Sequence, residues 1–215
     1  VRRAGTQRAA LPQGHMTDTL ELRMRAVELV AIGASAGGVD ALLTLFTRLP
    51  QGWRLPIVVV LHLPEDHESR LPLVFADRMH LPVVEALDKA PVMPATLYFA
   101  PPGYHLSVER ERCFSLSCEP PVLFSRPSID VLMGSAADAY GPALAGLVLT
   151  GANEDGARGL AQIREAGGIT AVQDPAHAQS PTMPRAALRP HRPDVVAPLP
   201  ALRDFLIRMD ACHAQ

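Results

Sequence analysis

The chain is poor in cysteine and in long apolar runs, and each shortage argues against a class of protein. There are three cysteines, an odd number, and they have no metal-type spacing to histidine. A reduced, cytoplasmic setting is therefore favoured over a disulfide framework. The longest apolar runs, around residues 57–61 and 143–149, are far too short to cross a bilayer. The first 25 residues carry five arginines and no apolar core of a secretory signal. We therefore expect a cytoplasmic protein without direct membrane insertion.

A strong charge of either sign is also missing. The net charge is −2 and no arginine stripe stands out, which argues against nucleic-acid binding through a broad basic face. The composition itself, 48% hydrophobic and 20% charged over 215 residues, is that of one globular domain with a sizeable core. Residues 1–26 show no clear period and predict a flexible leader. Residues 27–210 then form the domain, and residues 211–215 a short tail.

Strand-like and helix-like segments alternate from residue 27 onward. Short apolar runs rich in β-formers at residues 27–32, 57–61 and 82–85 are separated by helical spacing at residues 39–46 and 71–78. Further strands are predicted at residues 144–150, 169–173 and 195–197, and a closing helix at residues 202–209. Strands that are apolar on both faces and alternate with helices indicate a parallel sheet covered on both sides.

One segment breaks this rhythm. Between residues 97 and 117, apolar and polar residues alternate around the charged stretch 109–112, which predicts an antiparallel hairpin. The expected fold class is therefore α/β, a doubly wound and mostly parallel sheet with helices on both faces and an antiparallel hairpin at one edge.

Three polar residues each follow a predicted buried strand: Ser35, His62 and Asp155. Ligands bind at this edge of open α/β sheets, because loops from several strands meet there. Ser35 is the centre of Gly-Ala-Ser-Ala-Gly, which matches G-x-S-x-G, a tight strand-to-helix turn that exposes a serine oxygen. His62 is a candidate base for that serine, and Asp155 a candidate for orienting the imidazole.

Each of these residues also has a structural interpretation. The glycine-rich stretch could be a degenerate phosphate-binding loop, His62 a hydrogen-bonded structural histidine, and Asp155 a helix N-cap. Asp130 and Asp174 are rival acids for His62. We favour Asp155 because it alone follows a strongly buried strand, and the coincidence of three such residues at strand ends favours a catalytic site.

Six ordered blocks carry a family resemblance: VAIGASAGG, VLHLP, FAPPGYHL, RPSIDVLMGSAA, LVLTGANEDGA and QDPAHAQSPTMPRAA. Together they resemble the catalytic domain of the chemotaxis protein-glutamate methylesterases, the CheB family, from about residue 27 to residue 206. The resemblance implies a doubly wound sheet and hydrolysis of glutamate γ-methyl esters on the cytoplasmic helices of chemoreceptors, with methanol released. Many members also deamidate receptor glutamines. No metal or organic cofactor is implied.

Carried over by motif, the resemblance implies Ser35 as nucleophile, His62 as base and Asp155 as orienting acid. Backbone N–H groups of Ala36, Gly37 and Ala152 are candidates for an oxyanion hole. In the last block, Met183 and Arg185 are candidates for docking the receptor, with simple packing as the alternative for Met183.

The sequence departs from the family pattern in three places. Ala152 and Asn153 stand where the family commonly has Met and Gly, and Ala36 stands where Thr is frequent. A glycine replaced by asparagine matters if the loop needs a positive φ. In addition, only about 26 residues precede the first predicted strand, too few for the receiver domain of typical members. We therefore expect a site that phosphorylation does not gate in cis.

Three functions follow from the sequence. The first is a methylesterase acting on receptor glutamyl esters, and the second is a deamidase using the same triad. The third is a catalytically weak module that docks a receptor or kinase complex.

Overall fold

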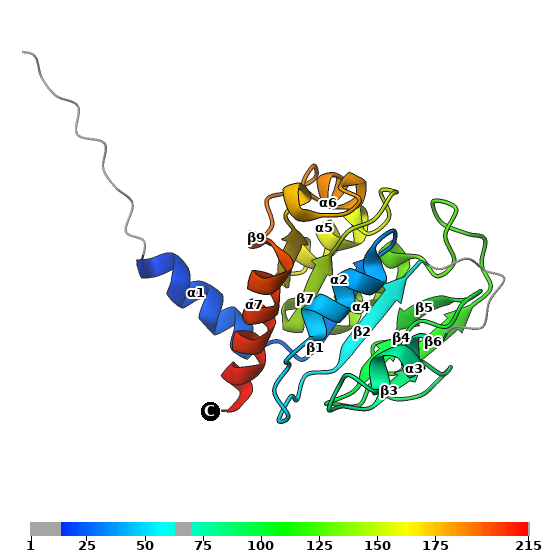
Figure 1. The fold of residues 1–215 in the computed structure, drawn as a ribbon, viewed down its shortest axis with the longest axis horizontal. Helices are drawn as coiled ribbons and strands as arrows, with labels where there is room; N and C mark the ends of the chain where they lie inside the picture. Colours follow the sequence, from blue (N-terminus) through cyan, green and yellow to red (C-terminus); the bar gives the residue numbers. More distant parts are fainter. Residues whose placement is uncertain (1–13, 63–69, 215) are drawn as a thin grey trace, which may run out of the picture.

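The computed structural model describes residues 14–62 and 70–214, which form a seven-stranded parallel sheet with helices on both faces and a separate two-stranded hairpin (Figure 1). The main sheet has the order β3-β4-β2-β1-β7-β8-β9. Its strands are β1 (Leu29–Ala34), β2 (Ile57–Leu61), β3 (Val83–Glu85), β4 (Leu97–Phe99), β7 (Leu144–Val148), β8 (Ile169–Gln173) and β9 (Val195–Ala197). All of its pairs are parallel. The doubly wound α/β prediction is confirmed.

Two hydrophobic clusters divide the core, one on each face of the sheet. Alternate residues of a strand point to opposite faces, so Val30 and Ile32 pack in one cluster and Leu29 and Ala31 in the other. The first cluster is covered by α1 (Gly14–Arg25), α2 (Gly38–Phe46), α3 (Leu71–Ala76) and α7 (Leu199–Ala211). The second is covered by α4 (Ile129–Tyr140), α5 (Ala157–Glu165) and α6 (Thr182–Ala187). Short 3-10 turns follow at Gly141–Ala143, Pro175–His177 and Cys212–Ala214.

The hairpin is antiparallel as predicted, but it is not an edge of the main sheet. Its strands β5 (His105–Val108) and β6 (Phe114–Ser117) form a sheet of their own. The preceding residues 97–99 instead form β4, a parallel strand between β2 and β3. The sequence analysis missed this strand because three buried residues give no readable period.

The predicted flexible leader is wrong for residues 14–25, which form α1. Met24 near its end is fully buried, and the last turn of α1 lies next to α7 in Figure 1. Residues 1–13 and 215 of the predicted leader and tail lie outside the described residues. The closing helix is also longer than predicted, because α7 begins at Leu199 and continues to Ala211. None of the helices in the described part of the chain has the length and apolar character needed to cross a membrane.

Asp194 connects α1 to the sheet. Its carboxylate accepts hydrogen bonds from the guanidinium groups of Arg23 at 2.6 Å and Arg164 at 2.8 Å, and from the backbone N–H of Thr170 at 2.9 Å. Burial opposes ionisation of this carboxyl, but the hydrogen bonds from Arg23 and Thr170 outweigh it and hold the pKa of Asp194 below its ordinary value. The ionised carboxylate therefore stabilises the folded state.

We expect Asp194→Asn to lower the free energy of unfolding by about 2 kcal/mol at neutral pH, because it removes hydrogen bonds between charged partners. A lowered folded-state pKa gives stability that is complete above the unfolded value of about 3.9 and is lost as the pH falls through the folded value. The deficit of Asp194→Asn, measured by urea unfolding, should therefore shrink in acid. Asp204→Asn, at an exposed pair with Arg203, is the control and should change little. An Asp194→Asn deficit that stays constant down to pH 2.5 would contradict the prediction.

Candidate active site

The first element of the site is the turn between β1 and α2. Residues 35–37 connect the end of β1 to Gly38 at the start of α2, and the N–H of Gly38 donates to the carbonyl of Ser35 at 2.7 Å. Gly37 has a φ of 77°, and a Cβ atom there would lie 2.4 Å from Oε1 of Gln179. A Cβ atom on Gly33 would lie 2.3 Å from Ile129. Both glycines of the G-x-S-x-G pattern are thus required, one by its backbone conformation and both by the space available.

The turn is fastened to the end of β7 by Thr150. The N–H of Ser35 donates to the carbonyl of Thr150 at 2.9 Å, and Oγ1 of Thr150 donates to the carbonyl of Ala36 at 2.8 Å. Ser35 is partly exposed. Because β1 lies between β2 and β7, this serine stands next to the ends of both strands, where the direction of the sheet connections reverses.

His62 directly follows β2. The parallel register places Ala34 opposite Leu61, and the N–H of His62 donates to the carbonyl of Ala34 at 3.1 Å. The backbones of Ser35 and His62 are therefore neighbours at the carboxyl edge of the sheet. No hydrogen bond joins the Ser35 hydroxyl to His62 or to any other residue that the structure describes. Catalytic hydrogen bonds are often formed only once substrate is bound.

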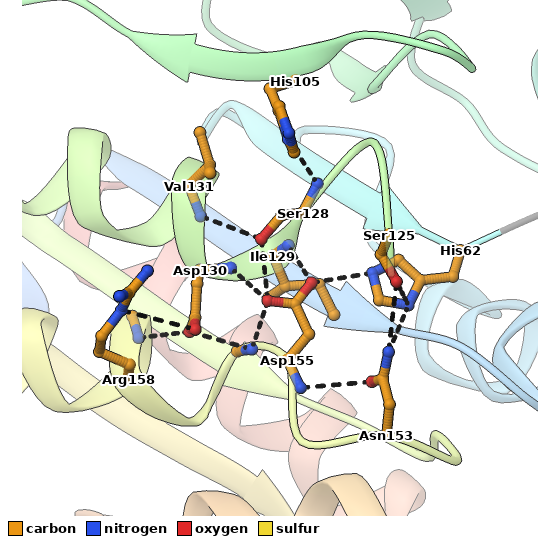
Figure 2. Close-up of polar contacts among 12 residues, drawn as sticks. His62, His105, Ser125, Ser128, Ile129, Asp130, Val131, Asn153, Asp155 and Arg158 are labelled. Carbon is orange, nitrogen blue, oxygen red and sulfur yellow. Dashed lines mark hydrogen bonds and ion pairs between the residues drawn. The ribbon is translucent and has the colours of Figure 1, made fainter. Parts of the chain in front are cut away.

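Asp155 contacts His62 directly. Its Oδ2 lies 2.9 Å from Nε2 of the imidazole, and its side chain is fully buried (Figure 2). Four further groups donate to the same carboxylate: the hydroxyl of Ser128 and the backbone N–H groups of Ile129, Asp130 and Gly156. Burial acts to raise the pKa of Asp155, yet the hydrogen bonds from His62 and from the backbone of Asp130 and Ile129 lower it overall.

An ionised Asp155 fixes the tautomer of His62. An ionised carboxylate only accepts hydrogen bonds, so Nε2 of His62 must carry a proton and Nδ1 is the basic nitrogen of the neutral ring.

The structure pairs His62 with Asp155 rather than with the rival acids Asp130 and Asp174. Asp130 binds the N–H groups of Gly156 and Gly159, and Asp174 binds His177.

Two residues that the sequence analysis did not select lie at Nδ1 of His62. The hydroxyl of Ser125 is 3.3 Å from this nitrogen and Nδ2 of Asn153 is 3.4 Å from it (Figure 2). Asn153 also donates to the Ser125 hydroxyl at 3.3 Å and accepts from the N–H of Asp155 at 3.3 Å. Asn153 is not among the described residues with positive φ, so the departure from glycine places no strain on this loop. A motif comparison marks Asn153 as unusual, but nothing in the sequence points to Ser125.

The oxyanion candidates lie in the two turns beside Ser35. Ala36 and Ala152 are exposed and Gly37 is half-buried. Within the part of the chain that the structure describes, no group accepts a hydrogen bond from their N–H groups. These donors are therefore open to an oxygen of a bound substrate.

The two docking candidates differ in exposure. Arg185 is exposed on α6, but Met183 is fully buried in the second core cluster and packs against Gly151. The docking prediction is wrong for Met183, and the alternative of simple packing holds.

The described residues contain no group of three or more His, Cys, Asp or Glu side chains placed to hold a metal ion.

Comparisons with known proteins point to one family. The family model described as CheB methylesterase matches residues 30–206. A protein-glutamate methylesterase/protein-glutamine glutaminase of Trichodesmium erythraeum is 37% identical over 196 residues, which cover 89% of this chain and 54% of that protein. A Leptospira interrogans relative whose name gives the same two activities is 40% identical over 183 residues, which cover 85% of this chain and 95% of the relative. The crystal structure of the Thermotoga maritima CheB methylesterase catalytic domain superposes with a TM-score of 0.80 at 28% identity, covering 85% of this chain and 98% of that one.

Proposed function

Because the chain belongs to the CheB methylesterase family, we propose that it hydrolyses the γ-methyl esters of glutamate side chains on the cytoplasmic helices of chemoreceptors. The observation that carries the proposal is the contact between the buried, ionised Asp155 and Nε2 of His62. It leaves Nδ1 as a candidate base at the sheet edge where Ser35 follows β1. This is the arrangement that activates a serine hydroxyl.

In the first half of the proposed reaction, Nδ1 of His62 accepts the proton of the Ser35 hydroxyl while Oγ of Ser35 attacks the carbonyl carbon of the ester. A bond forms between Oγ and the carbonyl carbon, and the negative charge moves to the former carbonyl oxygen. When the carbonyl re-forms, the bond to the methoxy group breaks and the imidazolium protonates it. Methanol leaves, and a glutamyl ester of Ser35 remains.

Water completes the cycle. Nδ1 of His62 accepts a proton from the attacking water, the ester bond to Ser35 breaks, and the imidazolium returns a proton to the Ser35 oxygen. Asp155 stays ionised throughout and stabilises the imidazolium. In both halves we propose that the N–H groups of Ala36, Gly37 and Ala152 bind the oxyanion. One such donor is typically worth about 3 kcal/mol of transition-state stabilisation.

Deamidation of receptor glutamines is a second activity that the same proposed catalytic triad could perform. The imidazolium would protonate an amide nitrogen instead of a methoxy oxygen, and ammonia would leave. The names of the Trichodesmium and Leptospira relatives give both activities, which supports this candidate.

The experiment that tests the proposal uses a methylated receptor cytoplasmic fragment and a second fragment with glutamine at the same positions. We expect the wild-type protein to release methanol from the first and ammonia from the second. In His62→Gln the rates of methanol release and of ammonia release should each fall by at least about a thousandfold, because no base remains. Binding of the fragments without release of either product would contradict the proposal and leave the docking module as the function.

A further inference from the structure

A tight turn at Val122–Ser125 stands beside the proposed catalytic histidine. The N–H of Val122 donates to the carbonyl of Ser125 at 3.1 Å, and the N–H of Ser125 donates to the carbonyl of Val122 at 2.9 Å. The two residues between them, Leu123 and Phe124, have φ values of 48° and 64°. Two-residue turns with positive φ at both central positions strongly prefer asparagine and glycine, so leucine and phenylalanine make this turn strained. Strain of this kind persists at sites that use it.

The side chains that occupy the strained positions face solvent. Phe124 is 101% exposed and Leu123 is 47% exposed, in a domain whose other phenylalanines are buried. Neither side chain contributes to the core, so packing within the domain does not explain why apolar residues replace the usual Asn-Gly. An exposed aromatic side chain beside a second exposed apolar side chain is instead typical of a surface that binds another protein.

The turn is also held in place. The carbonyl of Pro120 bonds to Nε2 of His105 at 3.1 Å, and Arg126 donates to the carbonyls of Cys118 and Glu119. On its inner side, Ser125 contacts Nδ1 of His62 and Nδ2 of Asn153 (Figure 2). Phe124 is thus one residue away from a group that touches the proposed base, on a loop fixed at both ends.

We propose that Leu123 and Phe124 form a substrate-docking tip that packs against the apolar side chains of a substrate helix, beside the esterified glutamyl group. The proposal rests on the proposed function. A helix that presents its ester to Ser35 must lie across the carboxyl edge of the sheet, and side chains three or four positions from the ester lie on the same helix face. The tip contributes binding to the helix and no chemistry, so it favours protein substrates over small esters.

Phe124→Ala tests this proposal with two substrates, the methylated receptor fragment and the α-amide of N-acetylglutamate γ-methyl ester. We expect the KM for the fragment to rise about tenfold with kcat unchanged, as for a lost binding contact. The kcat/KM for the small ester should stay within about twofold of the wild-type value, and Phe124→Trp should restore the KM for the fragment. Leu22→Ala, at an exposed apolar residue on α1, is the matched control and should leave both substrates unaffected.

A wild-type KM for the fragment in Phe124→Ala, or an equal loss with both substrates, would overturn the docking tip. Fragment binding, measured by fluorescence anisotropy in a Ser35→Ala background, separates this proposal from the proposed function. If the wild-type protein releases no methanol, the proposed function fails, yet an affinity about tenfold weaker in Phe124→Ala would still support the docking tip. Equal affinities with and without Phe124 would overturn it.

Discussion

Ser35→Ala is expected to reduce methanol release by at least about a thousandfold, whereas Ser125→Ala is expected to reduce it by less than about tenfold. The comparison matters because two serines lie near one histidine. The hydroxyl of Ser125 is 3.3 Å from Nδ1 of His62, while the Ser35 hydroxyl has no hydrogen-bond partner within the described parts of the chain. Proximity to the histidine alone would favour Ser125 as the nucleophile.

Oxyanion stabilisation favours Ser35 instead. A serine nucleophile needs donors for the oxygen that becomes negative, and the N–H groups of Ala36 and Gly37 follow Ser35 directly in a turn. The N–H of Ser125 already donates to the carbonyl of Val122. Ser125 is followed by Arg126 and Pro127, and a proline has no N–H, so one backbone donor follows Ser125 where two follow Ser35. We therefore expect Ser125 to hold the imidazole before substrate arrives and to yield Nδ1 to Ser35 afterwards.

Labelling distinguishes the two serines independently of turnover. A serine-reactive sulfonyl fluoride, followed by peptide mass spectrometry, should modify Ser35 in the wild-type protein and in Ser125→Ala. Thermal unfolding of both variants is the control for folding. An inactive Ser125→Ala beside an active Ser35→Ala, with the label on Ser125, would show that Ser125 is the nucleophile.

Apolar runs bounded by polar or turn residues were the part of the fold that the sequence predicted well. The bounds of β2, β8 and β9 agree with the predicted strands, because each run is apolar and ends at a polar or turn residue. The parallel arrangement followed from their burial on both faces. Other features were less predictable. The three residues of β4 were assigned to the hairpin that follows them, and the burial of Met24 and Met183 depends on contacts with distant elements.

The proposed site was predictable to the extent that it follows strand ends. Ser35, His62 and Asp155 were selected because carboxyl ends of parallel strands converge, and the contact between His62 and Asp155 agrees with that reasoning. Ser125 was not predictable, because it reaches His62 through a loop held by contacts to His105 and by a turn that lacks turn-forming residues. Side-chain contacts between irregular loops leave no periodic signal in a sequence.

Asp155→Asn is expected to reduce methanol release by about four orders of magnitude, because a neutral amide fixes the wrong tautomer of the imidazole and no longer stabilises its charged form. It should also lower the free energy of unfolding by about 3 kcal/mol. Both oxygens of this buried carboxylate accept from donors, Oδ2 from Ile129 at 2.6 Å and from His62 at 2.9 Å, and Oδ1 from three further groups. An amide NH₂ in either position would face donors that it cannot satisfy.

Asp130→Asn is the matched control, since this carboxyl is also buried and lies at the same helix end. Burial raises the pKa of Asp130, and only its Oδ1 accepts from backbone N–H groups, those of Gly156 and Gly159. An asparagine can keep Oδ1 in place, so Asp130→Asn should retain methanol release per folded molecule within a fewfold of wild type. Urea unfolding gives the folded fraction of each variant. If Asp130→Asn were as inactive as Asp155→Asn at equal folded fraction, the loss would reflect disruption of the α4 N-terminus, and the orienting role of Asp155 would be refuted.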